Sequence, residues 1–442
     1  MKVIHHGGKD TVTGSCHELF YSPKRSVLID CGQFQGEDVK PLAIRFPVHQ
    51  ISTLIITHAH IDHIGRLPWL LAAGYSGPIY CTAATAELMP LMLDDGLKLQ
   101  LGMKRSNRES ILALVKRRIK TIDYGRWQRV SAKDGVSKDY CYIRLNPAGH
   151  ILGSAYVEIK LSDDSIVVFT GDLGASNTPL LPDPISPQRA DYLFIESTYG
   201  NRCHEDVKSR SSRLKEIITR SLRDGGTILI PAFSVGRTQE LLFDIEQLIY
   251  QSELEADIPI ILDSPMAQKV TKSYRRFKKL WGKEAKQKIS QGRHPLAFKQ
   301  CIQIDNYPSH QRLVNRLASS GEPAIVVAAS GMCEGGRIVG YLKALLSDKR
   351  TDIVFAGYQA KGTLGQTLQS RPERVWIDGD EIEVKAQIHT MSGYSAHADN
   401  RDLHAFVDEI EVKPQEIHLI HGEFDAQLTF ANELVAKDYS VV

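Results

Sequence analysis

The chain has 442 residues, of which 42% are hydrophobic and 24% charged, the composition of an ordinary globular protein. This length exceeds what one hydrophobic core usually serves, so we expect two domains or one domain with a large insertion. The net charge of +2 is too small to indicate a polyanion-binding protein from the average alone, so any basic surface must be local.

Cysteine use and hydropathy favour a cytoplasmic protein. The seven cysteines are scattered and never form a C-x-x-C pair, which argues against a disulfide framework and against a thiolate zinc site. The first residues do not read as a secretory signal, and no run of about 18 apolar residues occurs. We therefore expect a cytoplasmic chain that does not enter a membrane.

The first part of the chain reads as short strands that stop at glycine and other turn formers, with two helical stretches between them. Strands are expected within residues 2–8, 17–21, 26–32, 52–60, 140–150, 154–161, 165–174 and 191–198. Helices are expected at 84–99 and 109–122. Strands, helices and strands again, with polar residues at the strand ends, indicate a layered α/β sandwich.

From about Ser209 the pattern changes to helices that alternate with continuous apolar strands. Such strands, for example residues 227–233 and 323–330, are typical of a parallel sheet covered by helices on both faces. From roughly Glu383, shorter strands and a helix return. We therefore expect a discontinuous first domain, residues 1–201 and 386–442, with a second α/β domain, residues 202–385, inserted into it.

One short stretch concentrates metal-ligand side chains directly after an apolar strand. The segment HAHIDHIG contains His58, His60, Asp62 and His63. In extended backbone, residues two apart point the same way, so His58 and His60 can converge on one ion, and the following turn brings Asp62 and His63 toward a second point. Nitrogen and oxygen ligands without thiolates favour zinc first and manganese next. The alternative is a surface loop with fortuitous histidines.

Six residues cannot complete a two-metal site, so further ligands must lie at other strand ends. Four segments share one form, in which an apolar strand ends in a histidine or aspartate next to or near glycine. These residues are Asp30, His150, Asp172 and His421.

The ordered set resembles that of the metallo-β-lactamase superfamily. The resemblance implies an αββα sandwich and three groups of ligands: His58, His60 and His150 on one metal, Asp62, His63 and His421 on the other, and Asp172 on both. It also implies that Asp30 orients ligands without binding a metal. Two metal ions activate water near neutral pH and stabilise charge at phosphorus or a tetrahedral carbon, so the set implies a hydrolase.

Three stretches extend the resemblance to the β-CASP branch of this superfamily. They are LFIESTYGNR with Glu196, SGYSAHAD with His397, and IHGEFD with His421. PAFSVGRTQELL and ASGMCEGGR also resemble β-CASP sequences. The match to stand-alone prokaryotic relatives of the nuclease that cuts pre-mRNA at its 3′ end implies a metallo-β-lactamase sandwich with an inserted α/β β-CASP domain.

The resemblance implies a metal-dependent ribonuclease with two zinc ions per chain, or manganese in their place, whose metal-activated hydroxide hydrolyses RNA phosphodiester bonds. The catalytic candidates are Asp62, Glu196 and His397. His397 can bind a phosphate oxygen or protonate the leaving ribose oxygen, and Glu196 can orient it and keep it cationic. A structural polar pair is the alternative for these two residues. The candidate contacts to RNA phosphates are Ser330, Gly331, Arg337 and Lys361.

A basic segment is the clue to substrate that does not depend on the resemblance. Residues 269–299 carry eleven Lys or Arg side chains against one acid, Glu284. If the segment is helical, one face presents Lys269, Lys272, Arg276, Lys279, Lys283 and Lys286. Such a stripe could follow phosphates, and an ordinary solvated helix face is the alternative. We expect Tyr274, Phe277 and Trp281 to be buried rather than to stack on bases.

The expected substrate is single-stranded RNA, cut internally and, as a second mode, from the 5′ end. His397 favours RNA because DNA-processing members of the branch often carry another residue there. The alternatives are a DNA-processing nuclease, a small-molecule ester, thioester or lactone hydrolase, and a non-catalytic RNA-binding scaffold. The long insertion argues against the small-molecule hydrolase, and the complete ligand set argues against the scaffold. The sequence leaves open the RNA target, the cleavage mode, the metal and the oligomeric state, including a homodimer.

Overall fold

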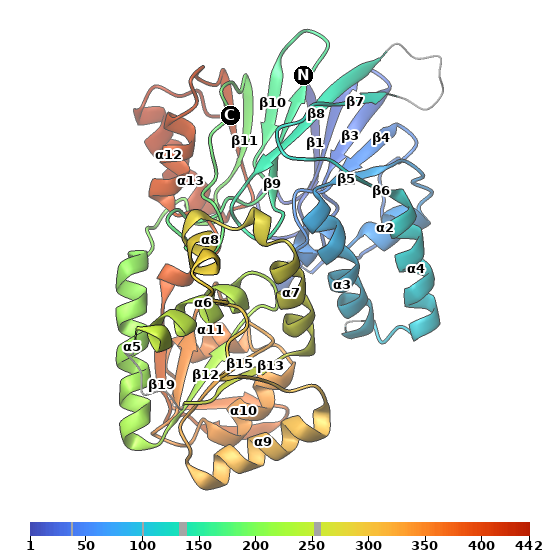
Figure 1. The fold of residues 1–442 in the computed structure, drawn as a ribbon. Helices are drawn as coiled ribbons and strands as arrows, with labels where there is room; N and C mark the ends of the chain where they lie inside the picture. Colours follow the sequence, from blue (N-terminus) through green and yellow to red (C-terminus); the bar gives the residue numbers. More distant parts are fainter. Residues whose placement is uncertain (37–38, 100, 132–138, 252–257) are drawn as a thin grey trace. The chain divides into compact units, whose positions relative to one another are not determined.

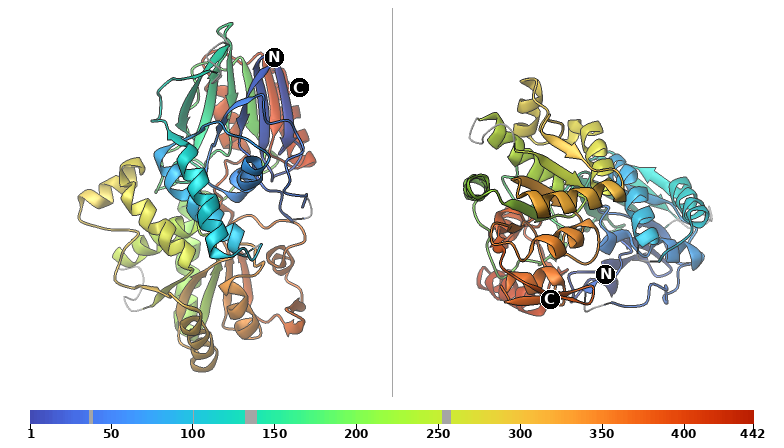
Figure 2. Two further views of the ribbon diagram at one scale, coloured as in Figure 1. Left: turned by 90° about the vertical axis from the view of Figure 1, so that its right-hand side faces the viewer. Right: turned by 90° about the horizontal axis from the view of Figure 1, so that it is seen from below.

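In the computed structural model the chain forms two compact units, each described by itself. The structure describes residues 1–36, 39–99, 101–131, 139–251 and 258–442. Unit 1 comprises residues 1–176, 181–203 and 397–442, and unit 2 comprises residues 177–180 and 204–396. Both chain termini lie in unit 1 (Figure 1, Figure 2). From the sequence we expect residues 386–396 in the first domain, but they belong to unit 2 because strand β19 (Gln387–Thr390) pairs with β16 of its sheet.

The first sheet of unit 1 has the strand order β1-β2-β3-β4-β5-β6. Its strands are β1 (Lys2–Gly7), β2 (Cys16–Ser22), β3 (Arg25–Ile29), β4 (Ile51–Ile55), β5 (Ile79–Cys81) and β6 (Ile119–Thr121). The strands β1 to β3 are antiparallel, whereas β3 to β6 are parallel. Ile29 pairs with Ile55, so the residues that follow β3 and β4 leave the sheet at the same edge.

The second sheet of unit 1 has the order β20-β11-β10-β9-β8-β7. Its strands are β7 (Gln128–Ser131), β8 (Tyr140–Pro147), β9 (Ala155–Lys160), β10 (Ile166–Phe169), β11 (Tyr192–Glu196) and β20 (Glu416–Ile420). The strands β10, β11 and β20 are parallel neighbours, although β20 comes from the end of the chain. Phe169 pairs with Phe194, and Glu196 with Ile420, so the residues after these three strands also gather at one edge.

The two sheets pack face to face around an apolar core, with helices on their outer faces. Val157 and Phe169 of the second sheet and Leu19 of the first are fully buried in this core. The first sheet is followed by α1 (Ile61–Ile64), α2 (Leu67–Ala72), α3 (Ala83–Leu99) and α4 (Arg105–Arg118), and the second by α12 (Asn400–Asp408) and α13 (Phe424–Ala436). Phe406 and Phe430 anchor α12 and α13 on the second sheet. Each such buried side chain contributes about 1.5–3 kcal/mol to folding. The predicted αββα sandwich is confirmed.

Unit 2 is built on a parallel six-stranded sheet of order β14-β13-β15-β12-β16-β19. Its other strands are β12 (Thr227–Pro231), β13 (Ile260–Asp263), β14 (Cys301–Gln303), β15 (Ala324–Ala328) and β16 (Asp352–Phe355). A separate hairpin joins β17 (Arg374–Ile377) and β18 (Asp380–Glu383). Four of the central strands are buried along their whole length, as the continuous apolar runs predict.

Helices cover both faces of the unit 2 sheet (Figure 1). Three helices, α9 (Tyr307–Ser320), α10 (Arg337–Leu345) and α11 (Leu364–Gln369), share one hydrophobic core with the sheet. The remaining helices are α5 (Val207–Asp224), α6 (Arg237–Tyr250), α7 (Pro265–Arg276), α8 (Lys283–Ser290) and the short turns η2 (Lys278–Leu280) and η3 (Ser392–Tyr394). Among the helices that the structure describes, none has the length and apolar character needed to cross a membrane.

A buried charge cluster joins α5 to α6 in unit 2. Arg210 is fully buried and donates hydrogen bonds to Asp244 at 2.9 Å, to Glu240 at 3.3 Å and to the carbonyl of Gly393 at 2.8 Å. Its guanidinium also lies 4.4 Å from the centre of the Tyr394 ring. One cation faces two carboxylates here. Burial raises the pKa of Glu240 to about 7. The charge of Arg210 opposes this rise, and the nearby carboxylate of Asp244 adds to it.

We expect the Glu240→Gln variant to lose a pH dependence of stability that the parent protein has. The pKa of Glu240 lies above its value of about 4.3 in an unfolded chain, so the folded state holds the proton between these two values. Stability should therefore fall as pH rises from 5 to 7.5, by at most about 1.4 kcal/mol per pH unit from this group. Urea unfolding at both pH values measures the slope. The exposed Glu216→Gln variant is the control, and equal slopes for the parent and Glu240→Gln would contradict the assignment.

Candidate active site

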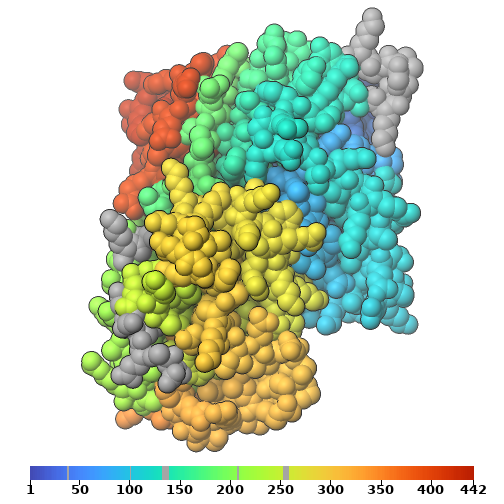
Figure 3. Space-filling view, viewed as in Figure 1, coloured from blue at the N-terminus to red at the C-terminus, as the bar shows by residue number. Residues whose placement is uncertain are grey.

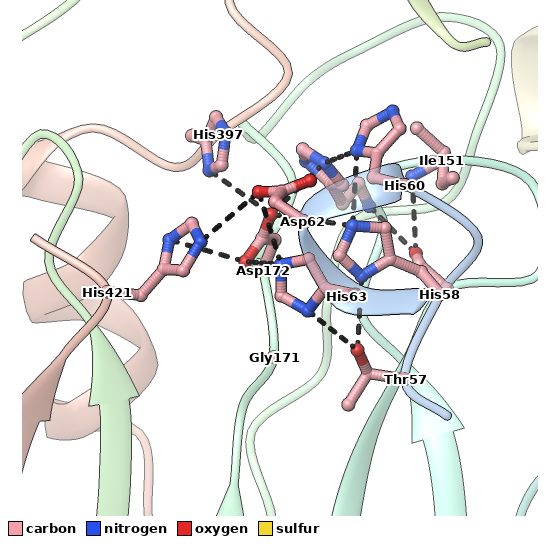
Figure 4. A network of polar contacts seen from close by, with 12 residues as sticks. Thr57, His58, His60, Asp62, His63, Ile151, Gly171, Asp172, His397 and His421 are labelled. Atoms are coloured by element: carbon pink, nitrogen blue, oxygen red, sulfur yellow. Dashed lines mark hydrogen bonds and ion pairs between the residues drawn. The ribbon is translucent and has the colours of Figure 1, made fainter. Parts of the chain in front are cut away.

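The parallel strand ends of unit 1 carry a cluster of histidines and aspartates (Figure 4). Asp30 follows β3 and His58 lies just beyond β4, at the edge where these strands leave the first sheet. Asp172 lies beyond β10 and His421 directly follows β20 in the second sheet. The β8–β9 connection carries His150. The two sheets thus bring together residues that are as far as 391 positions apart, because Asp30 and His421 serve the same cluster.

The segment after His58 forms the short helix α1 rather than a simple turn. It carries Asp62 and His63 into the cluster, and the carbonyl of His60 accepts hydrogen bonds from the backbone N–H groups of His63 and Ile64. The seven predicted metal ligands therefore lie in one place and divide into two groups that share Asp172: His58, His60, His150 and Asp172, and Asp62, His63, Asp172 and His421.

Three imidazoles and one carboxylate oxygen converge in the first group. The Nε2 atoms of His58 and His150 each lie 3.1 Å from Nδ1 of His60. Both Nε2 atoms also lie 3.5 Å from Oδ2 of Asp172. Ligands bound tetrahedrally to a zinc ion at about 2.0–2.2 Å lie about 3.4 Å from one another. The four atoms of this group have the spacing that one such ion requires.

The second group has similar spacing around the other oxygen of the shared carboxylate. Nε2 of His63 lies 3.2 Å from Oδ1 of Asp172 and 3.6 Å from Oδ2 of Asp62. Nε2 of His421 also lies 3.6 Å from Oδ2 of Asp62. Nε2 of His63, Nε2 of His421 and Oδ1 of Asp172 are buried without a hydrogen-bond partner among the described residues. Buried polar atoms without partners are costly, and a metal ion at this point would satisfy all three.

Neighbouring side chains fix the orientation of the ligands. Asp30 accepts hydrogen bonds from Nδ1 of His63 at 2.7 Å and from both the hydroxyl and the backbone N–H of Thr57. The Thr198 hydroxyl lies 3.2 Å from Nδ1 of His421. In both His63 and His421, the contact to the neighbouring side chain occupies Nδ1, and Nε2 faces the cluster. Such contacts determine which nitrogen of a histidine binds a metal. Asp30 was predicted in this role, whereas Thr57 and Thr198 were not, although each lies next to or near a predicted residue in the sequence.

Two of these residues hold a backbone conformation that side chains other than glycine seldom adopt. Asp30 has φ of 58° and His421 has φ of 49°. Such positions cost stability and persist where the surrounding structure demands them. Gly32 shows a related constraint, since a Cβ at this position would overlap the carbonyl of Asp62. The strand ends are therefore shaped to aim side chains inward.

The two groups differ in the charge that they favour. Burial lowers the pKa of His60 to about 4 and lowers that of His58 well below its usual value, so these rings are neutral, as metal ligands must be. At His63, burial opposes the charged ring, but the carboxylates of Asp172, Asp30 and Asp62 outweigh it and raise the pKa well above the usual value. This half of the cluster therefore favours a positive charge, which a bound metal ion would supply.

Glu196 and His397 form a pair at the edge of the metal-ligand cluster. Nδ1 of His397 lies 3.2 Å from both carboxylate oxygens of Glu196 and 3.9 Å from Oδ2 of Asp172. Glu196 is fully buried, and the backbone N–H groups of Leu173 and Thr198 hold it in place. Burial of His397 opposes protonation, but Glu196 and then Asp172 outweigh it and raise its pKa to about 9. The pair can therefore present a proton donor beside the cluster.

The four predicted phosphate contacts lie in unit 2 rather than in the cluster. Ser330 donates a hydrogen bond to the carbonyl of Glu334, and Gly331 is buried against Phe233. Arg337 donates to the buried carboxylate of Asp263, and it also donates to the carbonyl of Ile304. Lys361 is exposed. The partners of Arg337 occupy its guanidinium within the protein.

Comparisons with known proteins place the chain in a family. Residues 18–214 match the model of the metallo-β-lactamase superfamily, residues 238–368 match the β-CASP domain, and residues 381–442 match the "Zn-dependent metallo-hydrolase RNA specificity domain". These matches cover both units and the metal-ligand cluster, and they support a metal cofactor.

Related proteins match the chain along nearly its whole length. Ribonuclease TTHA0252 of Thermus thermophilus is 35% identical over 444 residues, which span 100% of this chain and 97% of the relative. Transcription termination factor FttA of Methanocaldococcus jannaschii is 32% identical, across 98% of this chain and 68% of the relative. The FttA protein of Methanosarcina mazei is 30% identical, across 99% of this chain and 69% of the relative. The chain belongs to the β-CASP ribonuclease family of the metallo-β-lactamase superfamily.

Proposed function

We propose that this metal-dependent ribonuclease cuts single-stranded RNA internally, with two zinc ions per chain and with Glu196 and His397 assisting the departure of the leaving group. The observation that carries the proposal is the division of seven ligands into two groups that share Asp172, with the Glu196–His397 pair 3.9 Å from the shared carboxylate. The RNA specificity domain at residues 381–442 and the ribonuclease among the relatives support RNA as the substrate.

Each ligand has a defined part in this proposal. His58, His60 and His150 would hold one ion, Asp62, His63 and His421 the other, and Asp172 would bridge them. Two zinc ions supply an activated water and positive charge for the developing negative charge at phosphorus. Asp62 closes the second group and lies at the exposed side of the cluster, where it is partly accessible. Its carboxylate can accept a hydrogen bond from the attacking water.

His397 would act on the leaving group. Nδ1 of His397 donates to Glu196, so we assign the transferred proton to Nε2. When the bond between phosphorus and the ribose oxygen breaks, this proton passes to the oxygen and leaves a neutral alcohol. Glu196 then faces a neutral ring that must take a proton from solvent before the next cycle. Ser330, Gly331 and Lys361 stay candidate phosphate contacts, and Arg337 would first have to leave Asp263.

Removal of the metal should abolish RNA cleavage and also lower the stability of the protein. A chelator would leave the buried carboxylates of Asp62 and Asp172 and the orphaned histidine nitrogens without a counter-charge. We expect thermal melting at a lower temperature after dialysis against chelator, and recovery of both properties on addition of zinc. Elemental analysis of the native protein should find two ions per chain, as the two ligand groups require. A metal content near zero in active protein would contradict the proposal.

The mode of cleavage can be read from a single-turnover reaction on end-labelled RNA. An unstructured RNA is prepared with a 5′-triphosphate or a 5′-monophosphate and with the label at its 3′ end. Internal cutting predicts the same intermediate fragments at the same rates for both RNAs, because no step recognises the 5′ end. A rate that depends on the 5′-monophosphate, with successive loss of single nucleotides, would show the 5′-to-3′ exonuclease mode instead.

A further inference from the structure

A cavity of about 370 Å³ opens on the surface of unit 2 beside α7. Its walls carry the cationic side chains of Lys272, Arg275, Arg276 and Lys278, together with His294. No carboxylate is among the described residues that line it. We call this cavity the α7 basic pocket, and none of its residues belongs to the metal-ligand cluster.

The pocket exists because the basic segment is not one continuous helix. Lys269 to Lys286 would share one face if the segment were a single helix, but α7 ends at Arg276, the turn η2 follows, and α8 begins at Lys283. The break brings Lys278 beside the cations of α7 instead of further along a stripe.

Buried aromatic side chains make this arrangement rigid. Trp281 is 2% exposed, and its Nε1 donates a hydrogen bond to the carbonyl of Tyr274 at 3.0 Å. Tyr274 itself is fully buried. As expected from the sequence, both rings pack inside unit 2, and Trp281 also contributes to the wall of the pocket. The cationic side chains therefore extend from backbone that the buried Tyr274 and Trp281 side chains hold in place.

Three of the four Lys and Arg side chains of the pocket have no ion-pair partner among the described residues. Elsewhere in the same segment, Lys288 pairs with Glu284 at 3.0 Å and Arg293 pairs with Glu246 at 2.5 Å. Lys272, Arg275 and Lys278 make no ion pair with any carboxylate that the structure describes. Like charges gathered in a small concavity repel one another and raise the local concentration of anions. A guanidinium among them can bind a phosphate through two parallel hydrogen bonds.

The surrounding surface favours a polymer over a single phosphate. Exposed lysines continue on both sides of the pocket at Lys269, Lys279, Lys283 and Lys286. The segment lies on the face shown in Figure 3, where it is coloured yellow. α7 has 12 residues and is about 18 Å long, which exceeds the reach of one nucleotide.

We propose that the α7 basic pocket binds the sugar–phosphate backbone of the single-stranded RNA substrate, as an anchoring site separate from the metal-ligand cluster. This inference rests on the proposed ribonuclease function. Contacts to phosphates carry no base information, so the pocket should increase affinity for RNA of any sequence. Each phosphate contact should also add to the salt dependence of binding.

Binding is measured by fluorescence anisotropy with a labelled, unstructured RNA and metal-loaded protein that carries His397→Ala to prevent cutting. Adding Lys272→Gln, Arg275→Gln and Lys278→Gln together should weaken binding at least about tenfold and reduce the slope of log K against log salt by about 2, since each single-strand contact contributes about 0.7. Arg275→Lys alone should give a smaller loss, because it keeps the charge but not the paired hydrogen bonds. All three side chains are exposed, so folding should be unaffected, which the melting temperature checks.

The matched control is the triple variant Lys24→Gln, Lys299→Gln and Lys349→Gln, which removes the same charge at exposed lysines that belong neither to the pocket nor to the lysines that flank it. We expect it to change affinity less than about threefold, since general screening weakens charges that do not contact phosphate. Equal losses for the two triple variants would overturn the pocket as a specific site. Inorganic phosphate at constant ionic strength should compete with RNA for the parent and much less for the pocket variant, because both ligands present phosphate oxygens to the same cations. If the pocket variant loses phosphate binding but keeps the parental affinity for RNA, the site takes a small anion and the RNA assignment fails. Neither readout requires cleavage, so the outcome is independent of the proposed hydrolysis.

Discussion

Replacing Asp172 by asparagine should reduce RNA cleavage by far more than any change that only reorients a ligand. Asp172 is the one residue shared by both ligand groups, with Oδ2 3.5 Å from His58 and His150 and Oδ1 3.2 Å from His63. Asparagine has the same shape but only one oxygen and no charge. Substitutions of residues that orient ligands typically cost about 10–100-fold. The loss from Asp172→Asn should exceed that range, and metal content should fall with it.

Two further variants calibrate this prediction. Thr57→Val removes the hydroxyl that donates to Asp30 but leaves all seven ligands in place, so we expect a loss within about 10–100-fold. Asp163→Asn changes an exposed carboxylate in the β9–β10 connection, and it should leave activity and metal content unchanged. Cleavage rates and elemental analysis of the three variants measure the order. An Asp172→Asn protein with full metal content and parental activity would remove the bridging role.

Much of this cluster could be predicted from the sequence because its signal is local. An apolar run that ends in histidine or aspartate near glycine marks a strand end. Parallel strands release their following residues at one edge, so Asp30 and His58 meet at the edge of the first sheet, and Asp172 and His421 meet at the edge of the second. The spacing of His58 and His60 likewise depends only on extended backbone.

The features that the sequence did not predict depend on contacts between distant segments. The end of α7 depends on where Trp281 can be buried, and helical periodicity carries no such information. Residues 387–390 read as a strand, but only pairing with β16 assigns them to unit 2. The buried position of Arg210 depends on Glu240 and Asp244, which lie a helix away. A charged residue in an amphipathic helix is ordinarily exposed, so nothing local distinguishes this one.

His397→Ala should reduce RNA cleavage about 10²–10⁴-fold, the usual contribution of a positioned acid or base, while metal content stays at the parental value. His397 belongs to neither of the two groups that the seven ligands form, and its Nδ1 is engaged with Glu196 at 3.2 Å. Glu196→Gln should reproduce part of the loss, since glutamine cannot hold the ring with a charged acceptor. The side chain of Glu196 is fully buried, so the substitution could also destabilise the fold. The melting temperature of the Glu196→Gln variant is therefore measured as well.

A change of leaving group then decides between two roles of His397. In a phosphodiester of p-nitrophenol, the p-nitrophenolate leaving group departs without a proton. The ribose oxygen that leaves from RNA needs one. If Nε2 supplies this proton, His397→Ala should impair cleavage of RNA severely and cleavage of the aryl ester only slightly. Equal losses on both substrates would mean that His397 binds a phosphate oxygen in the transition state instead. Equal activity of His397→Ala and the parent on RNA would exclude both roles and leave Glu196 and His397 as a structural pair, held together by the buried carboxylate and its two backbone donors.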